Sequence, residues 1–239
     1  GAYAASGGGL SIDLLTENDV RATIDMGART NSLSAGDQLL VDAKEYVLME
    51  SSVANVSIAA APIGLAIGAA VMTTRHSSNV TATVRKVSAA ARAIQINAAS
   101  DVDIDRVGAT GVSVGTIAAV INKSTSTASG QVKVLIDDAS VVGADSLEVR
   151  TNYDVNVRAT TFGIAAGLGA IGAMEAYSNA GSHGVNDSLI EIKGKSQLIS
   201  TRLNIVATIK SDLFAAATAG GGGGISATGA VSGLTDLTT

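Results

Sequence analysis

The residue types that carry chemistry are few and widely spaced in this chain. The only two histidines, His76 and His183, stand in polar stretches rich in Ser, Thr and Asn. An imidazole can act as a general base or as a metal ligand. Neither histidine has a second ligand at a familiar spacing, so both are predicted to be solvated residues of loops.

Three carboxylates alternate along one short segment, Asp101, Asp103 and Asp105. On a strand they would share one face, where they could bind Ca²⁺ or act as paired acids in polysaccharide cleavage. The Gly-Gly-x-Gly-x-Asp calcium repeat is absent. We therefore interpret the three aspartates as the solvated side of a strand.

Other motifs of catalysis and binding are missing or weak. The glycine run at 220–224 is not followed by Gly-Lys-Ser/Thr, no G-x-S-x-G elbow occurs, and the chain has 0 cysteines. Several Asn-x-Ser/Thr triplets leave glycosylation a weak option; they begin at Asn55, Asn79, Asn122 and Asn186. We expect no catalytic residue, no cofactor and no metal, hence no enzyme.

Composition excludes further classes of function. The net charge is −5 and the 16 Lys and Arg are scattered singly, which disfavours nucleic acid and anionic membranes as partners. Two apolar runs, 58–72 and 162–174, are shorter than the roughly 20 residues of a membrane-spanning helix. Membrane insertion is therefore not expected. Aromatic residues make up only 3%, so a thick, rounded core is not expected either.

The elements that must position these residues are strands, because apolar and polar residues alternate almost throughout. Val132-Lys-Val134-Leu-Ile136-Asp and Leu147-Glu-Val149-Arg are examples. No segment keeps an apolar stripe at helical spacing, so very little helix is expected.

A repeat runs through the chain and is anchored on strands of the type V-x-A-x-I. The last residue of each anchor stands at 24, 84, 136 and 192, so successive anchors are 60, 52 and 56 residues apart. This register predicts an all-β fold, a parallel β-solenoid with a repeat of 52–60 residues. Equivalent inward-pointing sites are expected at Ile24, Val84, Ile136 and Ile192.

The chain is interpreted as one solenoid segment, 1–239, cut from a longer array. Its four repeats are approximately 1–55, 56–110, 111–164 and 165–239. With strands of roughly five to seven residues and roughly 18–25 residues per coil, each repeat would hold two or three coils. At about 4.8 Å per coil the whole would be a thin rod on the order of 50–60 Å long. Both ends are expected to be open coils that stack on another copy or on the rest of a longer chain.

Polar segments before the anchors are predicted to be variable loops on one side of the solenoid, where any binding would occur. They cover residues 16–19, 73–79, 122–131 and 176–187. The candidate binding residues are Arg75, His76, Asn79, Asn122, Lys123, Tyr177, His183 and Asn186.

Several motifs resemble the leukotoxin-type filamentous adhesin family of Gram-negative bacteria. They include Val80-Thr-Ala82, Ser140-Val-Val-Gly-Ala144, Leu147-Glu-Val149 and Gly167-Leu-Gly169-Ala-Ile-Gly172-Ala. The resemblance covers nearly the full chain. It implies a secreted, surface-attached right-handed β-helix that acts as a shaft or binds host cells, and it carries over no catalytic residue.

The sequence thus favours a structural shaft of an extracellular adhesin at the bacterial cell surface. Its partners would be itself and a glycan or protein of a host or neighbouring cell. One alternative is a self-assembling filament or sheath subunit without ligand. The other is a polysaccharide-active β-helix enzyme, since fold alone does not separate these functions.

Overall fold

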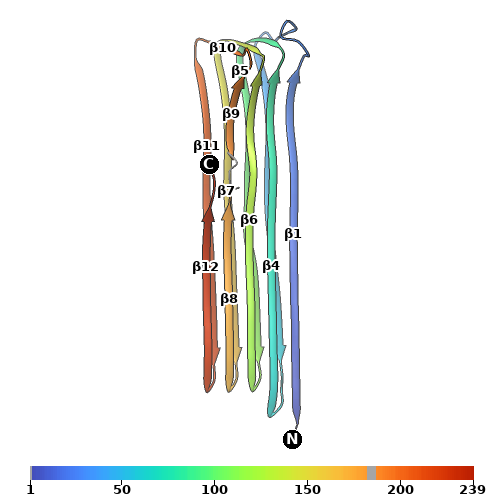
Figure 1. Ribbon diagram of the computed structural model, residues 1–239, viewed down its shortest axis with the longest axis vertical. Helices are drawn as coiled ribbons and strands as arrows, with labels where there is room; N and C mark the ends of the chain where they lie inside the picture. The colour runs from blue at the N-terminus through green and yellow to red at the C-terminus, as the bar shows by residue number, and fades with distance from the viewer. Residues whose placement is uncertain (1, 182–186) are drawn as a thin grey trace.

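A computed structural model describes residues 2–181 and 187–239 as two stacked layers of parallel strands (Figure 1). Sheet A has the order β1-β4-β6-β8-β12, with β9 also paired to β6. Sheet B has the order β10-β7-β5-β2, with β3 paired to β5 and β11 paired to β7. No helix occurs within these two ranges, so the all-β parallel solenoid is confirmed.

Most of the strands are long. Their bounds are β1 Tyr3–Asp25, β2 Ser32–Ser34, β3 Gln38–Ile58, β4 Ile63–Arg85, β5 Ser88–Val114, β6 Ile117–Asp137, β7 Ser140–Ala166, β8 Gly169–Ala180, β9 Ser188–Lys193, β10 Gln197–Ser200, β11 Leu203–Gly222 and β12 Ile225–Asp236.

The chain makes one coil per repeat by crossing sheet A, turning, crossing sheet B in the opposite direction and turning back (Figure 1). The pairing places Ile24 beside Val84, Val84 beside Ile136, and Ile136 beside Ile192. The anchor register of 60, 52 and 56 residues read from the sequence is therefore confirmed.

The expected coil size and strand length were wrong. Strands such as β5 and β7 have 27 residues, so one long coil, rather than two or three short ones, fills each repeat. At about 3.3 Å per residue such strands are roughly 90 Å long, whereas four coils at about 4.8 Å rise only about 20 Å. The molecule is a long, narrow, flat blade whose long axis follows the strands (Figure 1).

Polar runs do not break the strands, because their side chains have partners on the sheets. The predicted loops at 16–19, 73–79 and 122–131 all lie inside strands, namely β1, β4 and β6. The real corners are short, and at one of them three equivalent residues have a left-handed backbone. These are Lys86 with φ 48°, Asp138 with φ 48° and Gly194 with φ 65°.

The main core fills most of the space between the sheets with aliphatic side chains. Val84 and Ile136 are buried in the two central coils, as the repeat predicts. Ile24 is only half-buried and Ile192 is 43% exposed, although they hold equivalent positions. The difference arises because their coils are the outermost ones and have a neighbouring coil on one side only.

A second, smaller core lies at the far end of the blade, beside the corners at 115–116 and 167–168; we call this end the tip. Most of its interior residues are small, and the one large side chain of the cluster, Met174, lies against Gly163. A Cβ added to Gly111 would meet the side chains of Asn122 and Val120 at 2.7 Å, and one added to Gly163 would meet Met174 at 2.0 Å. The Gly/Ala-rich stretches therefore mark the place where the two sheets approach most closely.

Candidate functional site: the open ends of the solenoid

The outermost strands leave one edge of each sheet unpaired at both ends of the solenoid. Within the described residues, β1 pairs only with β4, and β3 only with β5. At the other end β11 pairs only with β7, and β12 only with β8. We call the β1/β3 end the head and the β9–β12 end the tail. A long unpaired edge presents rows of N–H and C=O groups that can pair with another strand.

The interior of the solenoid is also accessible at the tail. Leu203 and Ile205 point inward in β11, next to Leu147 and Val149 of the coil before. Leu147 and Val149 are 0% exposed, but Leu203 is 50% and Ile205 43% exposed. A further coil would bury these side chains, so the tail combines unpaired backbone with uncovered apolar surface.

The structure separates the predicted binding residues into three groups. Arg75, Asn79, Lys123 and Tyr177 lie on the outward face of sheet A. His76 and Asn122 are buried between the sheets and cannot meet a surface partner. His183 and Asn186 lie outside the described residues, whereas the first part of the loop predicted there, 176–180, lies inside β8.

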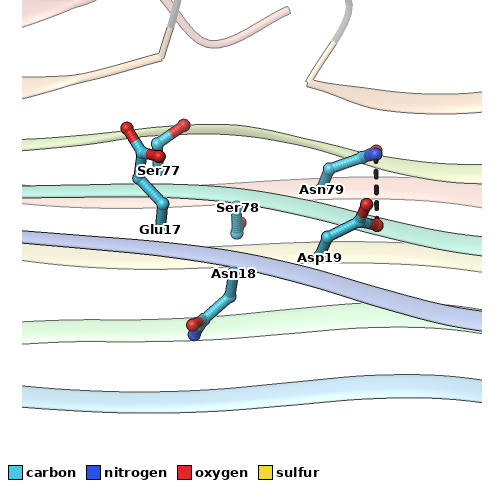
Figure 2. Close-up of a pocket in the computed structure, with 6 residues that line it drawn as sticks. All are labelled: Glu17, Asn18, Asp19, Ser77, Ser78 and Asn79. Carbon is cyan, nitrogen blue, oxygen red and sulfur yellow. Dashed lines mark hydrogen bonds between the residues drawn. The ribbon is translucent and has the colours of Figure 1, made fainter.

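Two parts of this outward face bring predicted residues together with others. The Lys123 ammonium lies 5.3 Å from the centre of the Tyr177 ring and 3.2 Å from Glu175. Asn79 donates a 3.5 Å hydrogen bond to Asp19, at a shallow hollow that Glu17 and Ser77 also line (Figure 2). Both parts are open and flat, and a recognition role for them remains a prediction.

The buried His76 belongs to an internal polar layer rather than to a reactive site. Its Nδ1 is 2.8 Å from the Thr16 hydroxyl, and its Nε2 is 3.5 Å from Glu45 Oε1. Asn18 and Ser100 donate hydrogen bonds of 2.6 and 2.8 Å to the same carboxylate. Burial lowers the pKa of His76, and Glu45 opposes this in part. The imidazole is thus held neutral in the folded protein near pH 7.

The acidic row on β5 faces solvent, as expected, and Asp103 and Asp105 each have a counter-group beside them. Asp103 accepts a 2.9 Å hydrogen bond from Asn156. Asp105 lies 3.6 Å from Arg106 and 3.8 Å from Arg158. Asp101 lies beside Asp154 in the register. Partial burial, and to a smaller extent repulsion from Asp154, raises the pKa of Asp101. No group of three potential metal ligands is found among the described residues.

Sequence reasoning missed one surface, the outside of the tip. Large apolar side chains point outward there on both sheets, while most of the interior residues are small. They include Leu65, Ile67, Ile117, Ile121, Ile171, Phe162 and Ile164. The signal was present as Ile and Leu alternating with Gly and Ala, but alternation alone does not say which set faces inward.

Comparisons of the chain with protein-family models, with curated proteins and with solved structures found no match. Across the part of the chain that the structure describes, no helix is long and apolar enough to pass through a membrane.

Proposed function

We propose that this protein is a structural segment that works by adding further coils to its two open ends. The observation that carries the proposal is the uncovered tail, where inward-facing Leu203 and Ile205 are half exposed beside an unpaired strand edge. Soluble proteins usually cover or interrupt such edges, because an exposed long edge templates association. The added coils would come from other copies or from the remainder of a longer chain.

The resemblance to filamentous adhesins supports an extracellular shaft as the setting for this stacking. A flat solenoid of repeated coils is suited to such a shaft, since each coil contacts only its neighbours and length can be added without changing the core. The polysaccharide-active alternative has little support in the geometry. On β5, Asp103 and Asp105 are matched by Asn156, Arg106 and Arg158.

Self-association of the 239-residue chain tests the proposal directly. We expect sedimentation velocity to show concentration-dependent growth, and electron microscopy to show filaments with a spacing of about 4.8 Å between strands. Leu203→Lys/Ile205→Lys would place two charges where the next coil must pack, and should suppress growth strongly. Because both side chains are half exposed, the long lysines can reach water and the molecule itself should still fold.

Asn204→Lys/Val206→Lys is the matched control, since these neighbouring side chains are exposed and point outward. It adds the same charge to the same strand without entering the interior. Equal growth of the parent and the control, with loss in the inward variant, would support stacking through the open tail. A parent that remains a monomer at all concentrations would exclude it.

A second function, recognition of a cell-surface glycan or protein, is favoured by one observation. Four of the candidate binding residues share the outward face of sheet A, and Lys123 and Tyr177 contact each other there. Lys123→Ala/Tyr177→Ala should then reduce binding to cells without changing the melting temperature. The same loss from Lys133→Ala, a more distant lysine of that face, would point to non-specific attraction.

A further inference from the structure

We propose that the solenoid stacks head to tail in one register, with Lys193 and Arg202 of one copy placed against Asp25 and Asp37 of the next. This inference rests on the proposed stacking function and adds the partner, the polarity and the contacts. It is carried by two rows of charge that run across the coils and alternate in sign.

The first row crosses sheet A at one corner of the blade. Register partners along it are Asp25, Arg85, Asp137 and Lys193, one from each successive coil. Arg85 lies 3.3 Å from Asp25, with Asp137 on its other side in the register. The row therefore ends with an acid at the head and a cation at the tail.

The second row runs along the same end of the blade, where sheet B begins. Its members, again one per coil, are Asp37, Arg92, Asp145 and Arg202. The pairing of Gln38 with Ala93 and of Ala93 with Ser146 aligns the first three, whereas Arg202 stands one position further along, opposite Ser146. Arg92 lies between two acids, 2.7 Å from Asp37 and 3.5 Å from Asp145. Arg202 lies beside Asp145, 3.4 Å from its backbone carbonyl. This row too has its acid at the head and its cation at the tail.

A second copy added at the tail continues both alternations. Arg202 would then lie between Asp145 and the incoming Asp37, as Arg92 lies between Asp37 and Asp145. Lys193 would lie between Asp137 and the incoming Asp25. Head-to-head or tail-to-tail contact would instead oppose like charges at both corners, which disfavours those pairings.

A third row adds a compatible contact. It consists of Tyr46, Asp101, Asp154 and Lys210 in successive coils. Lys210 lies 3.2 Å from Asp154, and Tyr46 is 69% exposed at the head. In the stack Lys210 would reach the incoming tyrosine ring, a contact of the kind that Lys123 already makes with Tyr177.

In the stack, β11 would pair along the edge of sheet B, and β9 would pair along the half of sheet A that lies away from the tip. In the half nearer the tip, Asp236 of β12 occupies the place that Thr16 holds in the first coil, since both lie in the row through His76, Ala128 and Ala180. In the stack, β12 of one copy and residues 5–16 of the next would compete for the same positions, so this part of β1 would have to be displaced. The two charged rows lie at the opposite end of the blade from β12, so this displacement does not affect them.

Charge reversal tests the register. Asp25→Lys/Asp37→Arg reverses the head, and Lys193→Asp/Arg202→Asp reverses the tail. Each variant alone would oppose like charges, so we expect the concentration needed for growth to rise about tenfold or more at low salt. The rise should shrink as salt is added. Mixed in equal amounts, the two variants are complementary at both junctions and should grow together as an alternating polymer at nearly the parent's concentration.

Circular dichroism melting of each variant checks that it folds, and the four-fold variant with both ends reversed is a second test because it should again grow alone. If the parent grows but reversal of either end changes nothing, the register is wrong while stacking stands. If reversal blocks growth and neither mixing nor the four-fold variant restores it, the proposed pairs are also wrong. If the parent does not grow at all, the stacking function fails and this inference with it.

Discussion

The main core and the tip use the same alternating pattern with opposite outcomes. In the main core the large residues Val84 and Ile136 face inward and are buried. In the tip the inward positions include Gly111, Gly163 and Asn122 beside Val120 and Met174, and most of the large residues point to solvent. Both regions belong to the same strands, β5, β6 and β7, so one strand changes its pattern along its length.

The distance between the sheets explains this reversal. In the tip a side chain as short as Asn122 accepts a hydrogen bond from Ala70 N at 3.1 Å and donates one to Phe162 O, in the opposite sheet, at 2.7 Å. Ser178 likewise reaches the Phe214 carbonyl across the gap at 2.6 Å. Sheets this close leave little room for large side chains, and Met174 fits only because Gly163 lies opposite it. Backbone polar groups are satisfied there by short polar side chains. Binary pattern alone therefore does not define inside and outside in this fold.

The largest expected effect comes from a charge in the main core. Ile136→Asp would bury an unpaired carboxylate at a position that is 0% exposed, and should reduce the free energy of unfolding by about 4 kcal/mol or more. Leu135→Asp, on the outward face beside it, is the control and should cost under about 1 kcal/mol. Thermal and urea unfolding measure both, and equal melting of the two variants would contradict the inward assignment of Ile136.

A smaller effect is expected where the tip meets its polar border. Asn122→Leu keeps nearly the same volume but removes both bonds to backbone, leaving buried groups of Ala70 and Phe162 without that partner. We expect a loss of about 2–3 kcal/mol. Asn79→Leu, the same change on the outward face, should cost about 0.5 kcal/mol or less. A hydrophobic replacement that stabilises position 122 would show that the tip is not closed by polar contacts.

These two positions also show what the sequence could and could not predict. Ile136 was placed correctly because its strand repeats at 60, 52 and 56 residues with large side chains on one face. Asn122 was placed in a loop because Asn, Ser and Thr usually indicate turns. Here these side chains form hydrogen bonds to the opposite sheet. Asn122, for example, bonds to the carbonyl of Phe162, which is 40 residues away in the chain. Local sequence does not contain that information, so strand length and coil size were underestimated together.

The candidate site divides in the same way. Stacking ends were predicted from repetition, because each coil needs a neighbour on both sides. The charged corners were not predicted, since Asp25, Arg85 and Asp137 become neighbours only when the coil length is known. The register read from the sequence places them in one row, but with two or three coils per repeat they would not have been adjacent.

A pH dependence should arise from the polar layer within the main core. Burial lowers the pKa of His76, so above its unfolded value near 6.5 the residue is neutral in both states and costs nothing. As the pH falls below that value the unfolded chain binds a proton that the folded protein does not, and stability is lost. His76→Gln should flatten this slope between about pH 6.5 and 5. Urea unfolding at several pH values measures the slope, and an unchanged slope in the variant would assign it to other groups.

The smallest effect on folding is expected on the outside of the tip, and it is the sharpest test of the reversed pattern. Ile121 is 53% exposed and points outward, while its neighbour Val120 is 0% exposed and points inward. Ile121→Ser should change the free energy of unfolding by about 0.5 kcal/mol or less, whereas Val120→Ser should cost about 2 kcal/mol. The outward change should instead reduce binding of a hydrophobic dye, because a cluster of exposed aliphatic side chains is what such a dye detects. If Ile121→Ser destabilised the protein more than Val120→Ser, the tip would have its large side chains inside, and the contrast between the two regions would disappear.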